Sequence, residues 1–172
     1  MWYDVIEVIL MTEAEKRTRR VCFTGHRPEK LMRSEIDILM ELEAEIRRAV
    51  ADGFTTFISG MAPGVDIWAA EIVLRIRDEG APIKLICASP FEGFEKRWSP
   101  YWSSKYTAIM VRADLVRYIC PGYSKPCFQI RNEWMVNRSA RVIAVFNGEP
   151  SGTRNTIVYA NRVGVPVVTI KG

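Results

Sequence analysis

The sequence has few residues that bind metals or form disulfides. Its 172 residues include one histidine, His26, and four cysteines, Cys22, Cys87, Cys120 and Cys127, without CxxC spacing. A structural zinc site needs a cluster of such ligands, so we expect neither a metal nor another cofactor. Scattered cysteines are typical of reduced thiols, which predicts a cytoplasmic protein.

Long apolar runs and a strong excess of one charge are also lacking. The longest mostly apolar run, residues 5–11, contains a glutamate and is far shorter than the ~18–20 residues that span a bilayer. We therefore expect no membrane partner. The 24 Lys and Arg residues exceed the 20 Asp and Glu residues by four. This excess suits a small anionic ligand and makes nucleic acid the weaker prediction.

The composition indicates one folded domain preceded by an extension. With 48% hydrophobic and 26% charged residues, the chain resembles an ordinary globular domain of roughly 100–200 residues. Residues 1–19 differ, because an apolar stretch is followed by a polar one. We interpret 1–19 as an extension that is flexible or forms a short helix docking on a partner. Residues 20–172 are expected to form a single domain.

Strand and helix patterns alternate from residue 20 onward. Short apolar runs predict strands at 20–24, 54–59, 83–87, 115–119, 141–146 and 167–170, and amphipathic stretches between them predict helices at 34–50, 63–78, 98–111, 128–139 and 153–163. This alternation is typical of an α/β fold with a mostly parallel sheet of about six strands and helices on both faces. Ligands bind such sheets beyond the carboxyl ends of the strands.

The helix at 34–50 has a recognisable start and an apolar stripe. Ser34, followed three residues later by Asp37, resembles a capping box. The apolar side chains that we expect on the buried face are Ile36, Leu39, Met40, Ile46 and Val50.

The first strand is followed by a loop suited to an anion. After Thr24, Gly25 permits a tight turn. His26 comes next, at the carboxyl end of a strand, where a titratable side chain can contact a ligand. Arg27 can donate two hydrogen bonds to a phosphate or carboxylate. The alternative is a capped turn with a solvated arginine.

The second strand leads into a loop with two glycines four residues apart. Between Ser59 and the following helix, Gly60 and Gly64 allow backbone N–H groups to approach a ligand closely. The loop matches neither GxGxxG nor the Walker pattern, which argues against a P-loop NTPase. Asp66 lies in the first helical turn, where it would repel a phosphate. It is expected to bind a ribose hydroxyl or a base donor, or else only to stabilise the helix.

The fifth strand is followed by a third polar loop. The residues expected to bind a phosphate here are Ser151, Gly152, Thr153, Arg154 and Asn155. The alternative is a polar loop in which Thr153 is the N-cap of the last helix. In a parallel sheet all three loops would open onto the same edge.

Taken together, these loops resemble those of a known family. The motifs are TGHRP at 24–28, SGMAPGVDIWAAE at 59–71 and GTRNT at 152–156. They are similar to those of the YpsA-like (DUF1273) group of the SLOG superfamily, whose relatives include DprA and the LOG enzymes. The resemblance covers residues 20–172. It implies a Rossmann-like three-layer sandwich that binds a nucleotide or nucleotide-derived ligand across the glycine loops.

The resemblance leaves a catalytic function open. LOG enzymes carry PGGxGTxxE, whose glutamate helps to cleave an N-glycosidic bond, whereas here Ser151 replaces a glycine and Thr156 or a neighbour stands at the glutamate position. Arg131 resembles an arginine of those enzymes. The alternative is therefore a hydrolase that cleaves an N-glycosidic or phosphoester bond, with His26 or Asp66 as acid or base and Arg131 binding charge.

A third hypothesis is a module that binds single-stranded nucleic acid or a protein. It depends on aromatic residues at helical spacing, namely Trp98, Tyr101, Trp102, Tyr106 and Trp134. Such residues can stack on bases, but at helical spacing they more often form a core or the interface of a homo-oligomer.

Overall fold

The computed structural model describes residues 11–172, so the expectations for residues 1–10 lie outside the described part of the chain. Six strands form one sheet in the order β4-β3-β2-β1-β5-β6, and every neighbouring pair is parallel. The strands are β1 (Arg20–Gly25), β2 (Thr56–Ser59), β3 (Lys84–Ser89), β4 (Leu115–Tyr118), β5 (Arg141–Phe146) and β6 (Val167–Lys171). The expected α/β class is confirmed.

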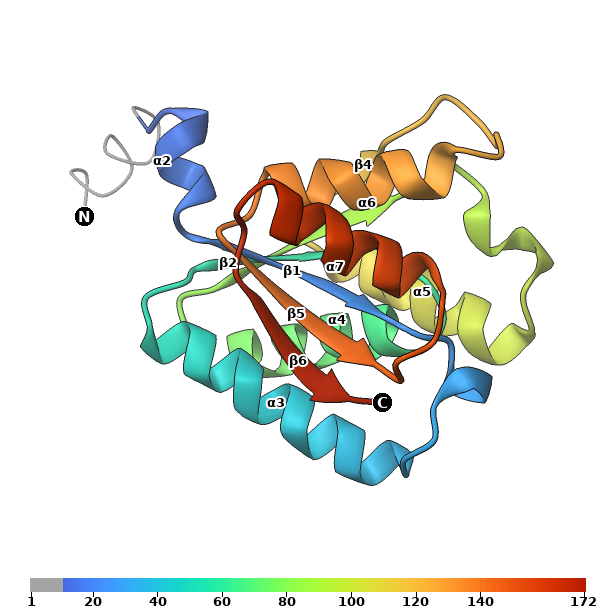
Figure 1. Cartoon of the computed structure of the whole chain (residues 1–172), viewed down its shortest axis with the longest axis horizontal. Coiled ribbons are helices and arrows are strands. Elements are labelled where there is room, and N and C mark those ends of the chain that lie inside the picture. Colours follow the sequence, from blue (N-terminus) through green and yellow to red (C-terminus); the bar gives the residue numbers. More distant parts are fainter. Residues whose placement is uncertain (1–10) are drawn as a thin grey trace.

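Helices cover both faces of the sheet (Figure 1). The helices are α2 (Glu13–Arg17), α3 (Glu35–Ala51), α4 (Val65–Asp78), α5 (Pro100–Arg112), α6 (Cys127–Asn137) and α7 (Gly152–Arg162), with short 3-10 turns η1 (Pro28–Lys30) and η2 (Phe94–Arg97). α3, α4 and α5 lie on one face, and α6 and α7 pack together on the other. Within residues 11–172, no helix combines the length and apolar character needed to cross a membrane.

The strands divide the core into two apolar layers because successive side chains point to opposite faces. In β1, Val21 and Phe23 join the layer under α3 and α4, whereas Cys22 joins the layer under α6 and α7. The same alternation puts Ile143 in the first layer and Val142 in the second. This two-sided burial explains why the central strands are almost entirely apolar.

Helix α3 confirms its expected buried stripe only in part: Ile46 is buried, and Leu39 and Val50 pack against the core. Ser34 does cap it, because its Oγ accepts a hydrogen bond from the backbone N–H of Asp37 at 3.2 Å. However, Ile36 and Met40 are 71% and 67% exposed. The buried residues are Ile38, Leu42, Ile46 and Ala49. The helix carries two apolar stripes, and packing against α4 and the sheet buries the one with regular helical spacing.

The strand order reverses between β1 and β5. The chain leaves β1 through α3 on one face and leaves β5 through α7 on the other. The loops that follow these two neighbouring strands therefore diverge and leave a crevice at the carboxyl edge. The candidate site lies in this crevice.

Candidate functional site

The loops after β1, β2 and β5 border one cavity of about 260 Å³ at the carboxyl edge of the sheet. Nine of the residues singled out from the sequence line it: Thr24, Gly25, His26, Arg27, Asp66, Arg131, Ser151, Gly152 and Thr153. They come from the β1 loop, the first turn of α4, the middle of α6 and the start of α7. The parallel sheet thus brings together residues that are up to 129 positions apart in the sequence, from Thr24 to Thr153.

Five of the residues expected at the site do not line the cavity: Ser59, Gly60, Gly64, Arg154 and Asn155. Arg154 and Asn155 are exposed to solvent. Ser59 is fully buried; its hydroxyl donates a hydrogen bond to the carbonyl oxygen of Asp66 at 2.7 Å and accepts one from the backbone N–H of Met61 at 3.2 Å. Ser59 therefore holds the second loop in shape.

Close approach between loops explains two glycines. Gly64 has φ of 94°, and a Cβ there would lie 2.8 Å from the carbonyl oxygen of His26. A Cβ at Gly25 would lie 2.4 Å from the Cβ of Val65, at the start of α4. Both distances are far below van der Waals contact, so these glycines let the first and second loops touch each other.

The second loop also contains a strained residue. Met61 is buried and has φ of 62°, and within residues 11–172 it is the one non-glycine residue with positive φ. Such a conformation costs of order 1–3 kcal/mol and is often found at functional sites. Here it turns the chain between Gly60 and the start of α4, beside the cavity.

Asp66 is a buried carboxyl with one unpartnered oxygen. Its Oδ2 accepts a hydrogen bond from the backbone N–H of Ala62 at 3.3 Å, and its Oδ1 is buried without a partner among the described residues. Burial raises the pKa of Asp66 to about 6, and the positive charge of Arg131 opposes this shift only in part. The carboxyl can therefore gain or lose a proton near neutral pH.

Arg131 brings a buried positive charge to the same place. Its Nη1 donates a hydrogen bond to the carbonyl oxygen of Gly60, and its Nε donates one to Oδ1 of Asn132 at 2.8 Å. A Cβ at Gly60 would lie 2.7 Å from Arg131 Nη1 and 2.9 Å from Asp66 Oδ2. Gly60 therefore lets the guanidinium and the carboxylate pack against the same stretch of backbone.

His26 is buried and neutral. Its ring stacks on Phe146 with centroids 5.7 Å apart, and its Nε2 is buried without a partner in the described part of the chain. Burial, with the positive charge of Lys30, lowers the pKa of His26 below its ordinary value of 6.5. At neutral pH the imidazole is uncharged and offers either a donor or an acceptor at Nε2, depending on its tautomer.

The N-terminus of α7 borders the opposite side of the cavity. Its N-cap is Ser151 rather than Thr153, because Ser151 Oγ accepts a hydrogen bond from the backbone N–H of Arg154 at 3.1 Å. No described atom lies within 4 Å of a Cβ built at Gly152. The first turn of the helix is therefore open, and its dipole favours an anion there.

The aromatic part of the cavity wall was not predicted from the sequence. Phe94 in the β3–α5 connection and Phe128 at the start of α6 both line the cavity, as do Lys30 and Asn132. The aromatic residues expected to bind bases do not line it. Tyr106, for example, is buried and donates a hydrogen bond to Ser89 Oγ at 2.8 Å. Neither Phe94 nor Phe128 directly follows a strand, so no local pattern marked them as cavity residues.

Comparisons with known proteins place these features in a wider group. A family model described as the YspA SLOG family matches residues 21–162. A UPF0398 protein of Bacillus thuringiensis (strain Al Hakam) is 30% identical over 148 residues, which cover 81% of this chain and 80% of that protein. A UPF0398 protein of Oceanobacillus iheyensis is 27% identical over 138 residues, which cover 76% of this chain and 74% of that protein.

Two solved structures share the fold. DNA processing protein A of Helicobacter pylori, studied for its single-stranded DNA binding mode, superimposes with a TM-score of 0.65 at 19% identity, covering 93% of this chain and 68% of that one. DNA processing protein A of Streptococcus pneumoniae superimposes with a TM-score of 0.65 at 20% identity, and the match covers 90% of this chain and 51% of that one. At these identities the likeness concerns the fold.

Proposed function

The chain belongs to the YspA SLOG family, and on this premise we propose that its carboxyl-edge cavity binds a nucleotide or a nucleotide-derived ligand. One observation carries the proposal. Asp66 Oδ1 and His26 Nε2 are buried without partners among residues 11–172, and both side chains line the same cavity. A buried polar group left unpaired costs about 1–3 kcal/mol. A ligand that carries hydroxyl or amino groups would remove both costs at once.

Other residues that line the cavity support a negatively charged end for this ligand. The first turn of α7 is open at Gly152, and the side chains of Arg27 and Lys30 also line the cavity. Backbone N–H groups at a helix N-terminus together with basic side chains are a common phosphate site in proteins. The ligand would therefore combine a phosphate with a polyhydroxyl group, as the ribose phosphate of a nucleotide does.

Replacing Gly152 with valine should abolish ligand binding and leave the fold intact. The new side chain enters open space in the free protein, because no described atom lies within 4 Å of the Cβ position. Without the substitution, a nucleotide at about 100 times its Kd should raise Tm by about 5–10 °C. The measurement is a thermal-shift assay with AMP, ADP-ribose and NAD.

The matched control is Ala51→Val, which places the same final side chain at an exposed position at the end of α3. It should keep the full nucleotide shift. If no nucleotide stabilises the wild-type protein, the proposal is wrong. If only a single-stranded oligonucleotide does, the chain shares the ligand of the Helicobacter pylori protein, and the cavity is a nucleic-acid site.

Hydrolysis of the ligand is the second candidate, and the pKa of Asp66 favours it. A carboxyl with a pKa of about 6 holds a proton in an appreciable fraction of molecules near neutral pH. Asp66 would protonate the departing base while water adds to C1′ of the ribose. The second proton of that water then returns to Asp66, and the products are a free base and a sugar phosphate.

Chromatography of AMP incubated with the protein tests this second candidate. Release of adenine is expected to fall at least about 100-fold in Asp66→Asn, because the amide donates no proton to the leaving group. AMP that binds and remains intact would limit the function to binding.

A further inference from the structure

Four aromatic side chains form a cluster beside the cavity, which we call the aromatic rim: Phe91, Phe94, Tyr123 and Phe128. Phe94 and Phe128 line the cavity itself. Phe91 lies next to both, with ring centroids 5.5 Å from Phe94 and 6.2 Å from Phe128. The rim therefore joins the β3–α5 connection to the start of α6.

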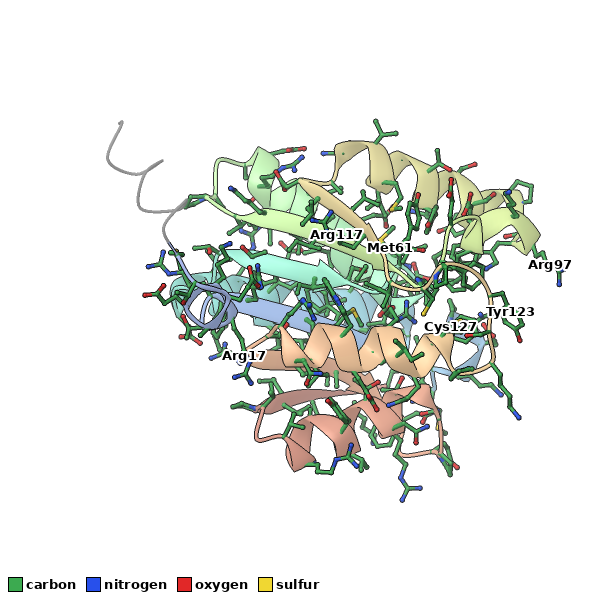
Figure 2. The ribbon with its side chains drawn as sticks, turned by 90° about the horizontal axis from the view of Figure 1, so that it is seen from above. Arg17, Met61, Arg97, Arg117, Tyr123 and Cys127 are labelled. Carbon is green, nitrogen blue, oxygen red and sulfur yellow. The ribbon has the colours of Figure 1, made fainter. Side chains whose placement is uncertain are left out.

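Tyr123 is the exposed member of the aromatic rim. Its ring meets Phe91 at 80° with centroids 5.9 Å apart, and Phe128 at 63° with centroids 6.3 Å apart. Even so, Tyr123 remains 72% exposed. Figure 2 shows it close to Cys127, the first residue of α6, and at the opposite end of the molecule from Arg17. Two edge-to-face contacts thus support an aromatic ring whose remaining surface faces solvent.

The size of the cavity indicates where a base would lie. Its volume of about 260 Å³ is below the ~300–1,000 Å³ of typical small-molecule sites. The N-terminus of α7 suits the phosphate, and the buried atoms of Asp66 and His26 suit sugar hydroxyls. The base would then lie at the border of the cavity, where the aromatic rim offers a stacking surface.

We infer that Tyr123 and Phe128 form a base-stacking subsite, so that the ligand is a nucleotide held with its phosphate at α7 and its base on the aromatic rim. This inference rests on the proposed function, because it specifies how the ligand occupies the same cavity. Stacking on an aromatic side chain tolerates any base. The subsite therefore distinguishes nucleotides from sugar phosphates and is expected to favour the larger purines.

Calorimetric titration with AMP and with ribose 5-phosphate tests the inference. The wild-type protein should bind AMP about tenfold more tightly than ribose 5-phosphate. Tyr123→Ala should lower AMP affinity about tenfold and leave ribose 5-phosphate affinity unchanged, whereas Tyr123→Phe should bind both like wild type. Because Tyr123 is mostly exposed, these variants should keep the wild-type Tm.

Tyr101→Ala is the matched control, since Tyr101 is an exposed tyrosine on α5 that does not line the cavity. It should bind both compounds like wild type. Equal wild-type affinities for AMP and ribose 5-phosphate, or full AMP affinity in Tyr123→Ala, would overturn the base subsite and leave the proposed cavity function intact. Binding of neither compound would overturn both.

Discussion

Replacing Gly64 with alanine is expected to lower the free energy of unfolding by about 3–5 kcal/mol, a large share of the ~5–15 kcal/mol of a typical domain. Two effects add. The backbone has φ of 94° and ψ of −128°, a region that is open essentially to glycine alone. In addition, the new Cβ would lie 2.8 Å from the carbonyl oxygen of His26 and 2.8 Å from the Cδ of Pro28. Urea unfolding measures the change.

Gly80→Ala separates the two effects. Gly80 also has positive φ, 106°, but no described atom lies within 4 Å of a Cβ built there. The free energy of unfolding of Gly80→Ala should therefore fall only by the cost of the unfavourable backbone conformation, about 1–2 kcal/mol. Equal losses in the two variants would show that the contact between the first and second loops contributes nothing to stability.

The second large effect is a pH dependence that comes from Asp66. The pKa of its carboxyl is about 6 in the folded protein, against an ordinary value of 3.8. Between these values the folded protein holds a proton that the unfolded chain has released. Unfolding is therefore favoured as pH rises, and the titration of Asp66 should lower stability by about 2 kcal/mol between pH 4 and pH 6.

Other groups titrate near this pH range, and their contributions to stability rise with pH instead of falling. Burial and Lys30 lower the pKa of His26, so its contribution to stability rises with pH as the imidazole loses its proton. Arg75, with Arg47, lowers the pKa of Glu43 to about 2, and the resulting stability is lost as pH falls below about 4.5. The wild-type curve sums these contributions with those of Glu13, Glu15 and Glu41, whose pKa values are also lowered.

Asp66→Asn isolates the aspartate because it keeps the shape and removes the titration. The difference in unfolding free energy between wild type and this variant should change by about 2 kcal/mol from pH 4 to pH 7, with wild type relatively more stable at the acidic end. The measurement is urea unfolding at a series of pH values. A difference that stays flat would mean that Asp66 ionises normally.

The fold was predictable because each strand and helix carries its own signal. The strand at 141–146 was predicted with the bounds that β5 has, since it is a continuous apolar run between polar residues. The buried face of α3 was predicted only in part, because Ile36 and Met40 are exposed and Ile38 and Leu42 are buried instead. Only the packed sheet distinguishes two such stripes.

The candidate site was predictable only in part. Parallel strands bring their following loops to one edge, so the meeting of the loops that contain Gly25, Asp66 and Gly152 follows from the topology. The contribution of Phe128 depends on where α6 crosses the sheet, and the positive φ of Met61 has no counterpart in its residue type. Both properties arise from tertiary packing.

The glycines of the second loop have an evolutionary consequence. Gly60 and Gly64 are needed by neighbouring protein atoms, whereas the side chains of Asp66, His26 and Arg131 line the cavity. Descendants of one ancestor can therefore retain the glycine signature unaltered and still diverge in chemistry by exchanging a few side chains.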